Sequence, residues 1–291
     1  MTIDAIKLNI SATISDYKRD KKISIPEKVT QCRNISYGKF GKHNLLDVYY
    51  PEATFTPLPT IVNIHGGGYV YGSKEIYRRY CMYLAQQGFA VVNFNYRLAP
   101  RWKFPTPLLD TNTVMQWICE NASTYYLDPK NIIIVGDSAG AQLTSQYSAI
   151  ATNANYASHF GITAPSIKIR AIGLNCGMYD LIQVSGKTPS GVIKDYCGSR
   201  VNISDPRMDV LGAISTNYPP AFITTSCHDF LHDAAEPMYN YLISKGLTAE
   251  WKCYGTADQE DVAHVFHINI VHPEAVSCNE DSCTFFRKFL K

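Results

Sequence analysis

The chain has 291 residues, enough for one large α/β domain or two small ones with a sizeable buried core. Hydrophobic residues make up 46% of the chain and charged residues 18%, a composition that excludes wholesale disorder. The formal net charge of +2 is too close to neutrality to indicate a polyanionic partner, so nucleic-acid binding is not expected.

The amino-terminal residues mix charged and polar side chains among apolar ones, unlike the uninterrupted apolar segment of a signal peptide. No later apolar run is long enough to cross a bilayer. Nine cysteines are scattered without a C-x-x-C pair, which favours reduced thiols over a disulfide framework or a zinc site. We therefore expect a soluble, cytoplasmic protein with no membrane partner and no metal.

Residues 1 to about 43 form the first segment of the chain. Isoleucines at positions 3, 6, 10 and 14 have helical spacing, but no clear strand follows them. We interpret the segment as an appendage to the main body rather than a separate domain.

Strands and helices alternate through most of the remaining chain, which indicates βαβ crossovers and a parallel sheet. The predicted strands are Leu45 to Tyr50, Thr60 to Ile64, Phe89 to Asn95, Ile132 to Val135, Ala171 to Leu174, Ala221 to Cys227 and Ala249 to Tyr254. The predicted helices are Ser73 to Gln87, one ending near Asn121, Ala141 to Ala151, Ala234 to Lys245 and Asp281 to Phe289. Residues 176 to about 216 interrupt the alternation with glycines and prolines, and we interpret them as a functional insertion.

The most informative stretch begins with four β-branched residues, Ile132 to Val135, typical of a strand buried on both faces. It continues into Gly136-Asp137-Ser138-Ala139-Gly140, an instance of G-x-S-x-G, and then into a predicted helix. Such a sharp turn holds its serine on strained backbone, with the hydroxyl exposed at the carboxyl end of the sheet. Glycine is required at 136 and 140 because a Cβ would collide where strand and helix cross. The alternative is a glycine-rich turn that holds a phosphate.

A second glycine-rich stretch, His65-Gly66-Gly67-Gly68, follows the strand at Thr60 to Ile64. Three consecutive glycines cost backbone entropy, so their presence needs a reason. One reason is a set of backbone N–H groups turned toward a bound negative charge. The alternative is a plain flexible turn.

A serine hydroxyl is a poor nucleophile near neutral pH, so it needs a base, and the base needs an orienting acid. Asp229 directly follows a predicted strand, and His264 lies in the loop after the last one. Both lie downstream of Ser138, in the chain order Ser, Asp, His that accompanies a G-x-S-x-G turn in serine hydrolases.

Five ordered motifs resemble those of the hormone-sensitive-lipase-like carboxylesterases, which belong to the α/β-hydrolase superfamily. They are His65-Gly66-Gly67-Gly68, Tyr96-Arg97-Leu98-Ala99-Pro100, Gly136-Asp137-Ser138-Ala139-Gly140, His228-Asp229-Phe230-Leu231-His232-Asp233 and His264-Val265-Phe266. The resemblance runs from about residue 45 to the C-terminus. It implies a mostly parallel eight-stranded sheet flanked by helices. A catalytic domain would span 45–291, with a small cap built from residues 1–44 and the insertion at about 176–216.

The resemblance also implies roles for individual residues. Ser138 would be the nucleophile, Asp229 the orienting acid and His264 the general base. The oxyanion hole would consist of the backbone N–H groups of Gly67, Gly68 and Ala139. Tyr69 would contact the substrate and His65 would brace the glycine loop. No metal or other cofactor is implied.

Two motifs depart from the usual family residues. The family has Asp-Pro-Leu-Arg-Asp at 229–233, where this chain has Asp-Phe-Leu-His-Asp, and this leaves Asp233 as an alternative acid. The family has His-Gly-Phe where Val265 follows His264 here, and this leaves His267 and His272 as alternative bases.

These features predict a serine carboxylesterase that forms an acyl-enzyme. Bulky Tyr69 and Tyr71 after the glycine loop favour short acyl groups, acetyl to butyryl. Twenty tyrosines, together with Trp102 near the pocket by resemblance, make acetylated sugars candidate substrates. An amidase or arylformamidase on the same fold is one alternative, and a small-molecule receptor without catalysis is another. The expected partners are a small-molecule ester and, at most, a second copy in a homodimer.

Overall fold

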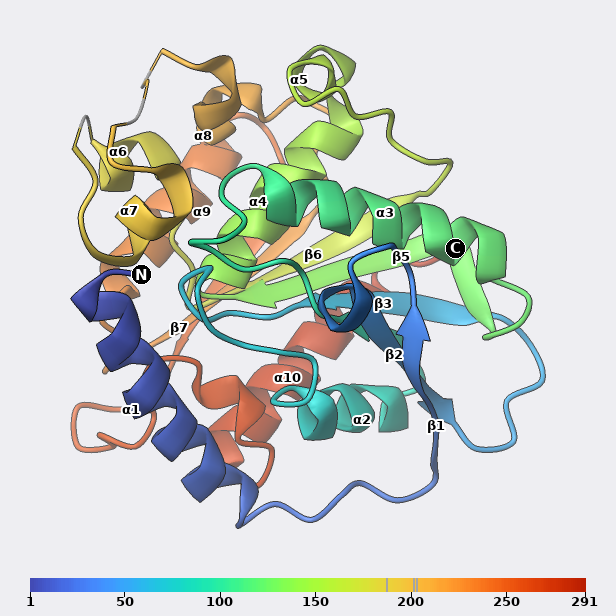
Figure 1. Ribbon diagram of the computed structural model, residues 1–291. Helices are drawn as coiled ribbons and strands as arrows, with labels where there is room; N and C mark the ends of the chain where they lie inside the picture. The colour runs from blue at the N-terminus through green and yellow to red at the C-terminus, as the bar shows by residue number, and fades with distance from the viewer. Residues whose placement is uncertain (187, 201, 203) are drawn as a thin grey trace.

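Runs of apolar and β-branched residues form one eight-stranded sheet at the centre of the computed structural model, which describes residues 1–186, 188–200, 202 and 204–291 (Figure 1). The strand order is β1-β2-β4-β3-β5-β6-β7-β8. The strands are β1 (Val29–Ser36), β2 (Leu45–Pro51), β3 (Leu58–Ile64), β4 (Ala90–Phe94), β5 (Leu127–Asp137), β6 (Ile169–Asn175), β7 (Ala221–Ser226) and β8 (Ala249–Tyr254). β2 pairs antiparallel with β1 and β4, whereas all pairings from β4 to β8 are parallel. The predicted mostly parallel eight-stranded sheet is confirmed.

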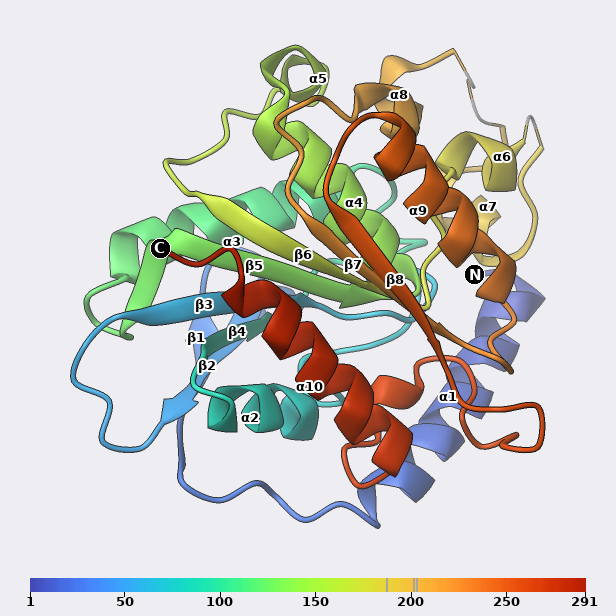
Figure 2. The same cartoon turned by 180° about the vertical axis from the view of Figure 1, so that it is seen from behind.

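Successive side chains of the central strands point to opposite sides of the sheet, so both faces are apolar, and helices bury both of them. In β5, Ile132 and Ile134 join one hydrophobic cluster while Ile133 and Val135 join another. Helices α3 (Thr106–Asn121), α4 (Ala139–Thr152) and α9 (Ala235–Ser244) cover the first face. Helices α2 (Arg78–Gln86) and α10 (Pro273–Arg287) cover the second, as the two opposite views show (Figures 1 and 2). Among the described helices, none has the combination of length and apolar character that crossing a membrane requires.

Several element bounds differ from the sequence prediction: α2 begins at Arg78 rather than Ser73, and β5 at Leu127 rather than Ile132. No clear strand is predicted in residues 1 to about 43, but Val29–Ser36 pairs with β2 at the sheet edge. Its largely polar, half-exposed residues lack the alternation that marks a strand, and the pairing supplies the order. The last helix begins at Pro273 rather than near Asp281, because His272 caps it by accepting from Glu274 N–H and proline suits the first helical position.

Helix α1 (Ile3–Asp20) exists as predicted, but its isoleucines face away from the body of the protein. The exposed fractions of Ile3, Ile6, Ile10 and Ile14 are 72%, 46%, 58% and 51%. The inner face is mostly polar, and Ala5 is its fully buried residue. The spacing of the isoleucines therefore predicted the helix correctly. The helix face that packs on the rest of the protein is the one opposite the isoleucines.

The insertion predicted at 176–216 contains helices α6 (Leu181–Ser185), α7 (Gly191–Cys197) and α8 (Val210–Ala213); its positions 187, 201 and 203 lie outside the described residues. Asp195 of α7 accepts hydrogen bonds from both the backbone N–H and the hydroxyl of Thr2, at 2.7 and 2.9 Å. The start of α1 is thereby tied to the insertion. The remaining short helices are α5 (Ala154–Ser158) and the 3-10 turns Gly41–Asn44, Pro206–Met208, His232–Ala234 and Phe266–Ile268.

The two chain ends lie at opposite sides of the molecule (Figure 1). The N-terminus lies beside α7, next to the insertion. At the other end, Lys291 and Asn131 form a reciprocal pair of hydrogen bonds of 2.9 and 2.7 Å, which holds the C-terminal residue against β5. The carboxyl edge of the parallel strands faces α1, not the C-terminus.

Candidate active site

The turn between β5 and α4 holds Ser138 in a strained backbone conformation, with φ 53° and ψ −120°. A Cβ on Gly136 would lie 2.3 Å from the carbonyl oxygen of Gly140, and one on Gly140 would lie 2.1 Å from that of Ile64. Both distances are far below van der Waals contact, so strand and helix cross this closely only because both positions are glycine. The predicted strained turn and the predicted reason for its glycines are both confirmed.

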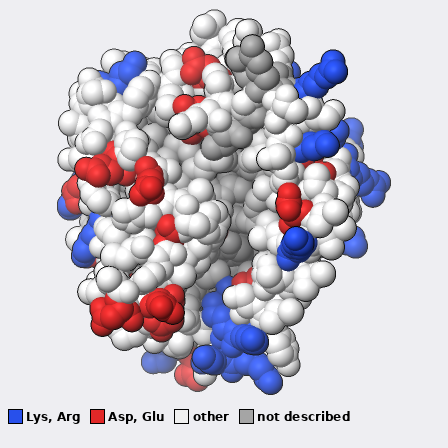
Figure 3. Space-filling view, turned by 90° about the vertical axis from the view of Figure 1, so that its left-hand side faces the viewer, with Lys and Arg blue, Asp and Glu red and all other residues white. Residues whose placement is uncertain are grey.

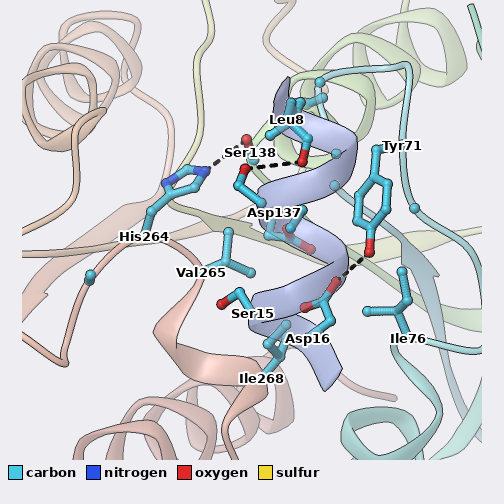
Figure 4. Close-up of a pocket in the computed structure, with 18 of the residues that line it drawn as sticks. Leu8, Ser15, Asp16, Tyr71, Ile76, Asp137, Ser138, His264, Val265 and Ile268 are labelled. Atoms are coloured by element: carbon cyan, nitrogen blue, oxygen red, sulfur yellow. Dashed lines mark hydrogen bonds between the residues drawn. The ribbon is translucent and has the colours of Figure 1, made fainter. Parts of the chain in front are cut away.

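Three side chains from three different loops, Ser138, Asp229 and His264, meet at the carboxyl edge of the sheet. Figure 4 shows the imidazole of His264 directed at Ser138. His264 Nε2 lies 3.0 Å from Ser138 Oγ, and His264 Nδ1 lies 2.6 Å from Asp229 Oδ1. Asp229 also accepts hydrogen bonds from Leu231 N–H at 2.9 Å and from the Thr225 hydroxyl at 3.1 Å. The carboxylate is thus fixed by two donors besides the imidazole, and the imidazole is oriented with one nitrogen toward the serine.

The electrostatics of Asp229 suit an ionised carboxylate. Burial by itself raises its pKa, but the hydrogen bond and the charge of His264 outweigh burial, with further help from Leu231 N–H and the Cys176 thiol. The pKa of Asp229 therefore lies below its usual value, and the carboxylate is ionised at neutral pH.

The alternative acid and bases lie elsewhere. Asp233 is fully exposed and contacts His232 at 3.0 Å. His267 is buried, and burial lowers its pKa to about 3, so it is held neutral. His272 caps α10 and lies 3.3 Å from Asp261. Of the candidate partners, Asp229 and His264 are the pair that the fold brings to Ser138.

The glycine loop after β3 lies beside Ser138 with its backbone in the left-handed region at Gly67 (φ 110°) and Gly68 (φ 58°). Among the hydrogen bonds of the described residues, the N–H groups of Gly67, Gly68 and Ala139 have no acceptor. Free N–H groups at this place can bind an anionic oxygen. His65 supports the loop from below: its Nδ1 lies 2.8 Å from Gly66 O and its ring stacks on Tyr96.

Tyr69 follows the loop and lines the cavity, but its side chain is almost completely buried. Its ring stacks on Tyr196 with centroids 3.7 Å apart, and its hydroxyl donates to Gln142 at 3.0 Å. Substrate contact by Tyr69 stays a prediction, confined to the part of the ring that faces the cavity. Trp102 was wrongly placed near the pocket: it packs on His43 and is not a cavity-lining residue.

A cavity of about 630 Å³ opens above the serine, large enough for a drug-sized ligand. The face on which it opens is hollowed along its middle (Figure 3). One wall is the inner face of α1, including Leu8, Ser15, Asp16 and Arg19. Asp16 accepts a hydrogen bond from Tyr71 at 2.8 Å, as Figure 4 shows, and from Arg19 at 2.6 Å. The sequence predicts that residues 1–44 contribute to a cap, but it does not identify these lining residues; their signal is the polar helix face opposite the isoleucines.

Val265 explains one departure from the family motif. It adopts the left-handed conformation at φ 62°, at the position where the family motif His-Gly-Phe has glycine, and its side chain lines the cavity. A non-glycine residue in that conformation costs roughly 1–2 kcal/mol, and for a β-branched residue it is an outlier. The backbone strain is thus retained together with a side chain that narrows the cavity beside His264.

Asp137, next to the serine, is buried beneath the glycine loop. Its Oδ2 accepts a hydrogen bond from the Tyr77 hydroxyl at 2.8 Å, while its Oδ1 has no partner among the described residues. Burial raises the pKa of Asp137 to about 7, and the charge of Asp16 adds to the effect. The carboxyl is therefore substantially protonated near neutral pH.

We expect Asp137→Asn to change how stability depends on pH. Between about pH 4 and 7 the folded chain binds more protons at Asp137 than the unfolded chain, whose aspartate pKa is about 3.9. The contribution of Asp137 to the free energy of unfolding therefore falls as pH rises through this window, by at most about 1.4 kcal/mol per pH unit. In urea unfolding at pH 5, 6, 7 and 8, the free energy of unfolding of the variant minus that of the wild type should increase from pH 5 to pH 7. A constant difference would contradict the raised pKa.

One group of potential metal ligands occurs among the described residues: donor atoms of Cys176, Asp229 and His264 lie within 4.8 Å of one another. Two of the three are already paired, since His264 Nδ1 and Asp229 Oδ1 share a short hydrogen bond. The donor set is therefore better explained by that pairing than by a cation between them.

Comparison with known proteins finds relatives and solved structures that are named as esterases. A family model described as BD-FAE matches residues 46–246. An ethyl acetate hydrolase from Pseudomonas putida is 28% identical over 208 residues, which cover 65% of this chain and 62% of that protein, less than two thirds of its length. Carboxylesterase NlhH from Mycobacterium tuberculosis is 27% identical over 250 residues, which cover 77% of this chain and 74% of that protein. The fold is similar to that of inhibited esterase B from Lactobacillus rhamnosis, with TM-score 0.88, 21% identity and coverage of 99% and 97%.

Proposed function

Because the chain belongs to the BD-FAE family, within the hormone-sensitive-lipase-like carboxylesterases of the α/β-hydrolase superfamily, we propose that it hydrolyses short-chain carboxylic esters through a Ser138–His264–Asp229 triad. The observation that carries the proposal is the contact geometry, 3.0 Å from His264 Nε2 to Ser138 Oγ and 2.6 Å from His264 Nδ1 to Asp229 Oδ1. Carboxylic ester hydrolysis is the activity for which its homologues are named.

The reaction proceeds in two steps. His264 Nε2 accepts the hydroxyl proton as Ser138 Oγ attacks the ester carbonyl, and Asp229 stabilises the imidazolium that forms. The imidazolium then gives the proton to the leaving alcohol, and an acyl-serine remains. A water molecule, deprotonated by the same imidazole, attacks the acyl-serine; as the bond to Ser138 Oγ breaks, the imidazolium returns the proton to Oγ and the carboxylic acid is released.

The negative charge of each tetrahedral intermediate is placed against the N–H groups of Gly67, Gly68 and Ala139. Removing one such donor typically costs about 3–4 kcal/mol of transition-state stabilisation. These donors are backbone groups, so the positions of the Gly67 and Gly68 N–H groups depend on the left-handed conformations of the glycine loop, and that of Ala139 N–H on the strained turn at Ser138.

Close packing over the glycine loop supports a preference for acetyl to butyryl groups. A Cβ on Gly68 would lie 3.1 Å from Leu8 and 3.3 Å from Val192, so these two side chains roof the loop tightly. Val265 narrows the cavity on the side of the imidazole. A relative named for the hydrolysis of ethyl acetate, an ester with a two-carbon acyl group, agrees with this preference.

Two measurements test the proposal. Hydrolysis of p-nitrophenyl esters from acetate to decanoate should give the highest kcat/KM at two to four carbons. A fluorophosphonate probe should label Ser138, which separates an esterase from a receptor built on the same fold. A chain that binds esters but neither turns them over nor reacts with the probe would refute the esterase assignment.

We expect Val265→Gly to broaden the acyl range. Glycine adopts the left-handed backbone freely, so the relief of about 1–2 kcal/mol of strain offsets its entropy cost of roughly 0.5–1 kcal/mol. The ratio of kcat/KM for hexanoate over acetate should rise several-fold with little change in Tm. Val265→Ala is the matched control: it widens the cavity similarly but keeps the strain, so its Tm should be the lower of the two. An unchanged ratio in both variants would show that Val265 does not limit acyl size.

The polar residues of α1 that line the cavity suit an ester whose alcohol part carries hydroxyl groups. We propose acetylated sugars as this class of substrate. The exposed Ser15 hydroxyl has no hydrogen-bond partner in the part of the chain that the structure describes, while Asp16 and Tyr71 present further polar atoms to the cavity. Apolar Ile76 and Ile268 lie on other parts of the wall, so a ring with one apolar face and a polar edge fits. Acetate release from acetylated xylose or glucosamine, compared with p-nitrophenyl acetate, tests the class. N-formylkynurenine in the same assay tests the amidase alternative.

A further inference from the structure

The outer face of α1 is unusually apolar for an exposed helix. Besides the four isoleucines described above, Tyr17 is 64% exposed on the same side. At about 100° per residue, the five side chains lie within an arc of about 80°. We call this set (Ile3, Ile6, Ile10, Ile14, Tyr17) the α1 stripe. A continuous apolar stripe of this kind marks an interaction surface.

The spacing of the α1 stripe is symmetric about its centre. Ile6 and Ile14 each lie four positions from Ile10, and Ile3 and Tyr17 each lie seven. A two-fold axis beside Ile10 would therefore place an apolar residue opposite every apolar residue of an antiparallel second helix. From this symmetry we propose that α1 packs antiparallel against α1 of a second copy, forming a two-fold symmetric homodimer. The contact is isologous, as two-fold dimers require.

The register fixes three kinds of contact. Ile10 meets Ile10 of the partner subunit on the axis. Ile6 meets Ile14 of the partner subunit, and Ile3 meets Tyr17 of the partner subunit. The stripe spans fourteen residues, or about 21 Å of helix, and forms the apolar core of the interface.

The charges beside the α1 stripe match the same arrangement. Asp4, Lys7 and Lys18 lie on the same flank and are all exposed, with Asp4 and Lys18 toward opposite ends of the helix. In an antiparallel two-fold pair the same flanks adjoin, so Lys18 lies within about 3 Å along the axis of Asp4 of the partner subunit. The two-fold axis generates the contact twice. Within the described residues neither Asp4 nor Lys18 has an ion-pair partner in its own chain.

A lipid surface is the other cover that an exposed apolar helix suggests. It requires basic residues along the polar flanks but no symmetric spacing of the apolar ones. This flank of the helix carries exposed Lys7 and Lys18 as well as Asp4, so its charges suit a lipid surface as well as a second copy. The symmetric spacing of the apolar residues, which a lipid surface does not need, favours the second copy.

Oligomeric state is the first test. Sedimentation velocity from about 1 to 100 μM should give a species of twice the 32.6 kDa chain mass at the upper end. Ile10→Asp places two carboxylates on the axis and should raise the dimer dissociation constant at least tenfold. Phe55→Asp is the matched control, because Phe55 is also exposed, at 83%, but lies on a distant loop. Circular dichroism and Tm should be alike for the two variants, since neither side chain is buried.

The register is tested by cross-linking with a short bismaleimide in a Cys227→Ser background, which removes an exposed native thiol. Ile10→Cys should cross-link to itself. Ile6→Cys alone should not, but should do so when mixed with Ile14→Cys. The charge contact is tested by D4K and K18D, each of which should weaken the dimer, while the double variant D4K/K18D should restore it.

Either of two results would overturn the proposal. One is a wild-type chain that stays monomeric over the whole concentration range. The other is a dimer that Ile10→Asp leaves intact. A monomer that sediments with phosphatidylserine vesicles, and loses this on Ile10→Asp, would assign the stripe to a lipid surface instead. Hydrolysis of p-nitrophenyl acetate by each variant is measured separately, so loss of the dimer and loss of the triad are distinguishable.

Discussion

Replacing Ser138 with alanine should lower kcat for p-nitrophenyl acetate by at least about 10⁴-fold. The variant keeps the turn, the imidazole and the glycine loop, but the attacking oxygen is gone, so no acyl-enzyme can form. What activity is left should come from binding and from the N–H groups of the glycine loop. The measurement is steady-state turnover, together with loss of labelling by a fluorophosphonate probe.

The stability of the Ser138 variant is its internal control. The hydrogen bond that the hydroxyl makes in the structure is the one to His264. Alanine at this half-buried position leaves the strained backbone as it is, and we expect its free energy of unfolding to change by less than about 1 kcal/mol. Turnover that survives the substitution in a well-folded variant would remove Ser138 from the mechanism.

Asp229→Asn should lower kcat by roughly 10⁴-fold, although it changes only one atom of the side chain. The carboxylate accepts a hydrogen bond from His264 Nδ1 and stabilises the positive imidazole formed during each step. An amide at that place can donate its N–H to Nδ1 instead, which leaves the proton on Nε2 and prevents that nitrogen from accepting the serine proton. KM should change little, because Asp229 is buried beneath the imidazole.

Asp233→Asn is the matched control for that prediction. It makes the same chemical change four residues later, at a fully exposed side chain, so kcat and Tm should stay at the wild-type values. The pair of variants thus decides between the two acids that the sequence left open. A loss of turnover in Asp233→Asn with an active Asp229→Asn would reverse the assignment.

The parts of the site that depend on local sequence could be predicted. The strained turn at Ser138 follows from two glycines and a β-branched strand, and the glycine loop from three consecutive glycines. The fold follows because alternating strands and helices have few ways to pack. The choice of Asp229 over Asp233 needed the structure, since exposure and the direction of each side chain depend on the loop after β7.

Features that depend on packing between distant segments could not be predicted. β1 is ordered by pairing with β2, not by its own alternation. Helix α1 has an apolar face that indicates helix but not which side packs. Its polar face lines the cavity through Asp16 and Arg19 because Thr2 and Asp195 fix the start of the helix over the sheet edge. Val265 could be noted as a departure from the His-Gly-Phe motif, but a β-branched residue gives no local signal for the left-handed backbone that it adopts.

The placement of the two chain ends has a practical meaning for work with this protein. Lys291 is held at the side of the sheet remote from the serine, so a purification tag, a fluorescent fusion or a solid support attached there leaves substrate entry unobstructed. A tag or fusion attached to Met1 would disturb the contact between the Met1 amine and Asp195, at the start of α1, the helix that forms one wall of the cavity. Immobilised biocatalysts made from this chain are therefore best anchored by their carboxyl tail.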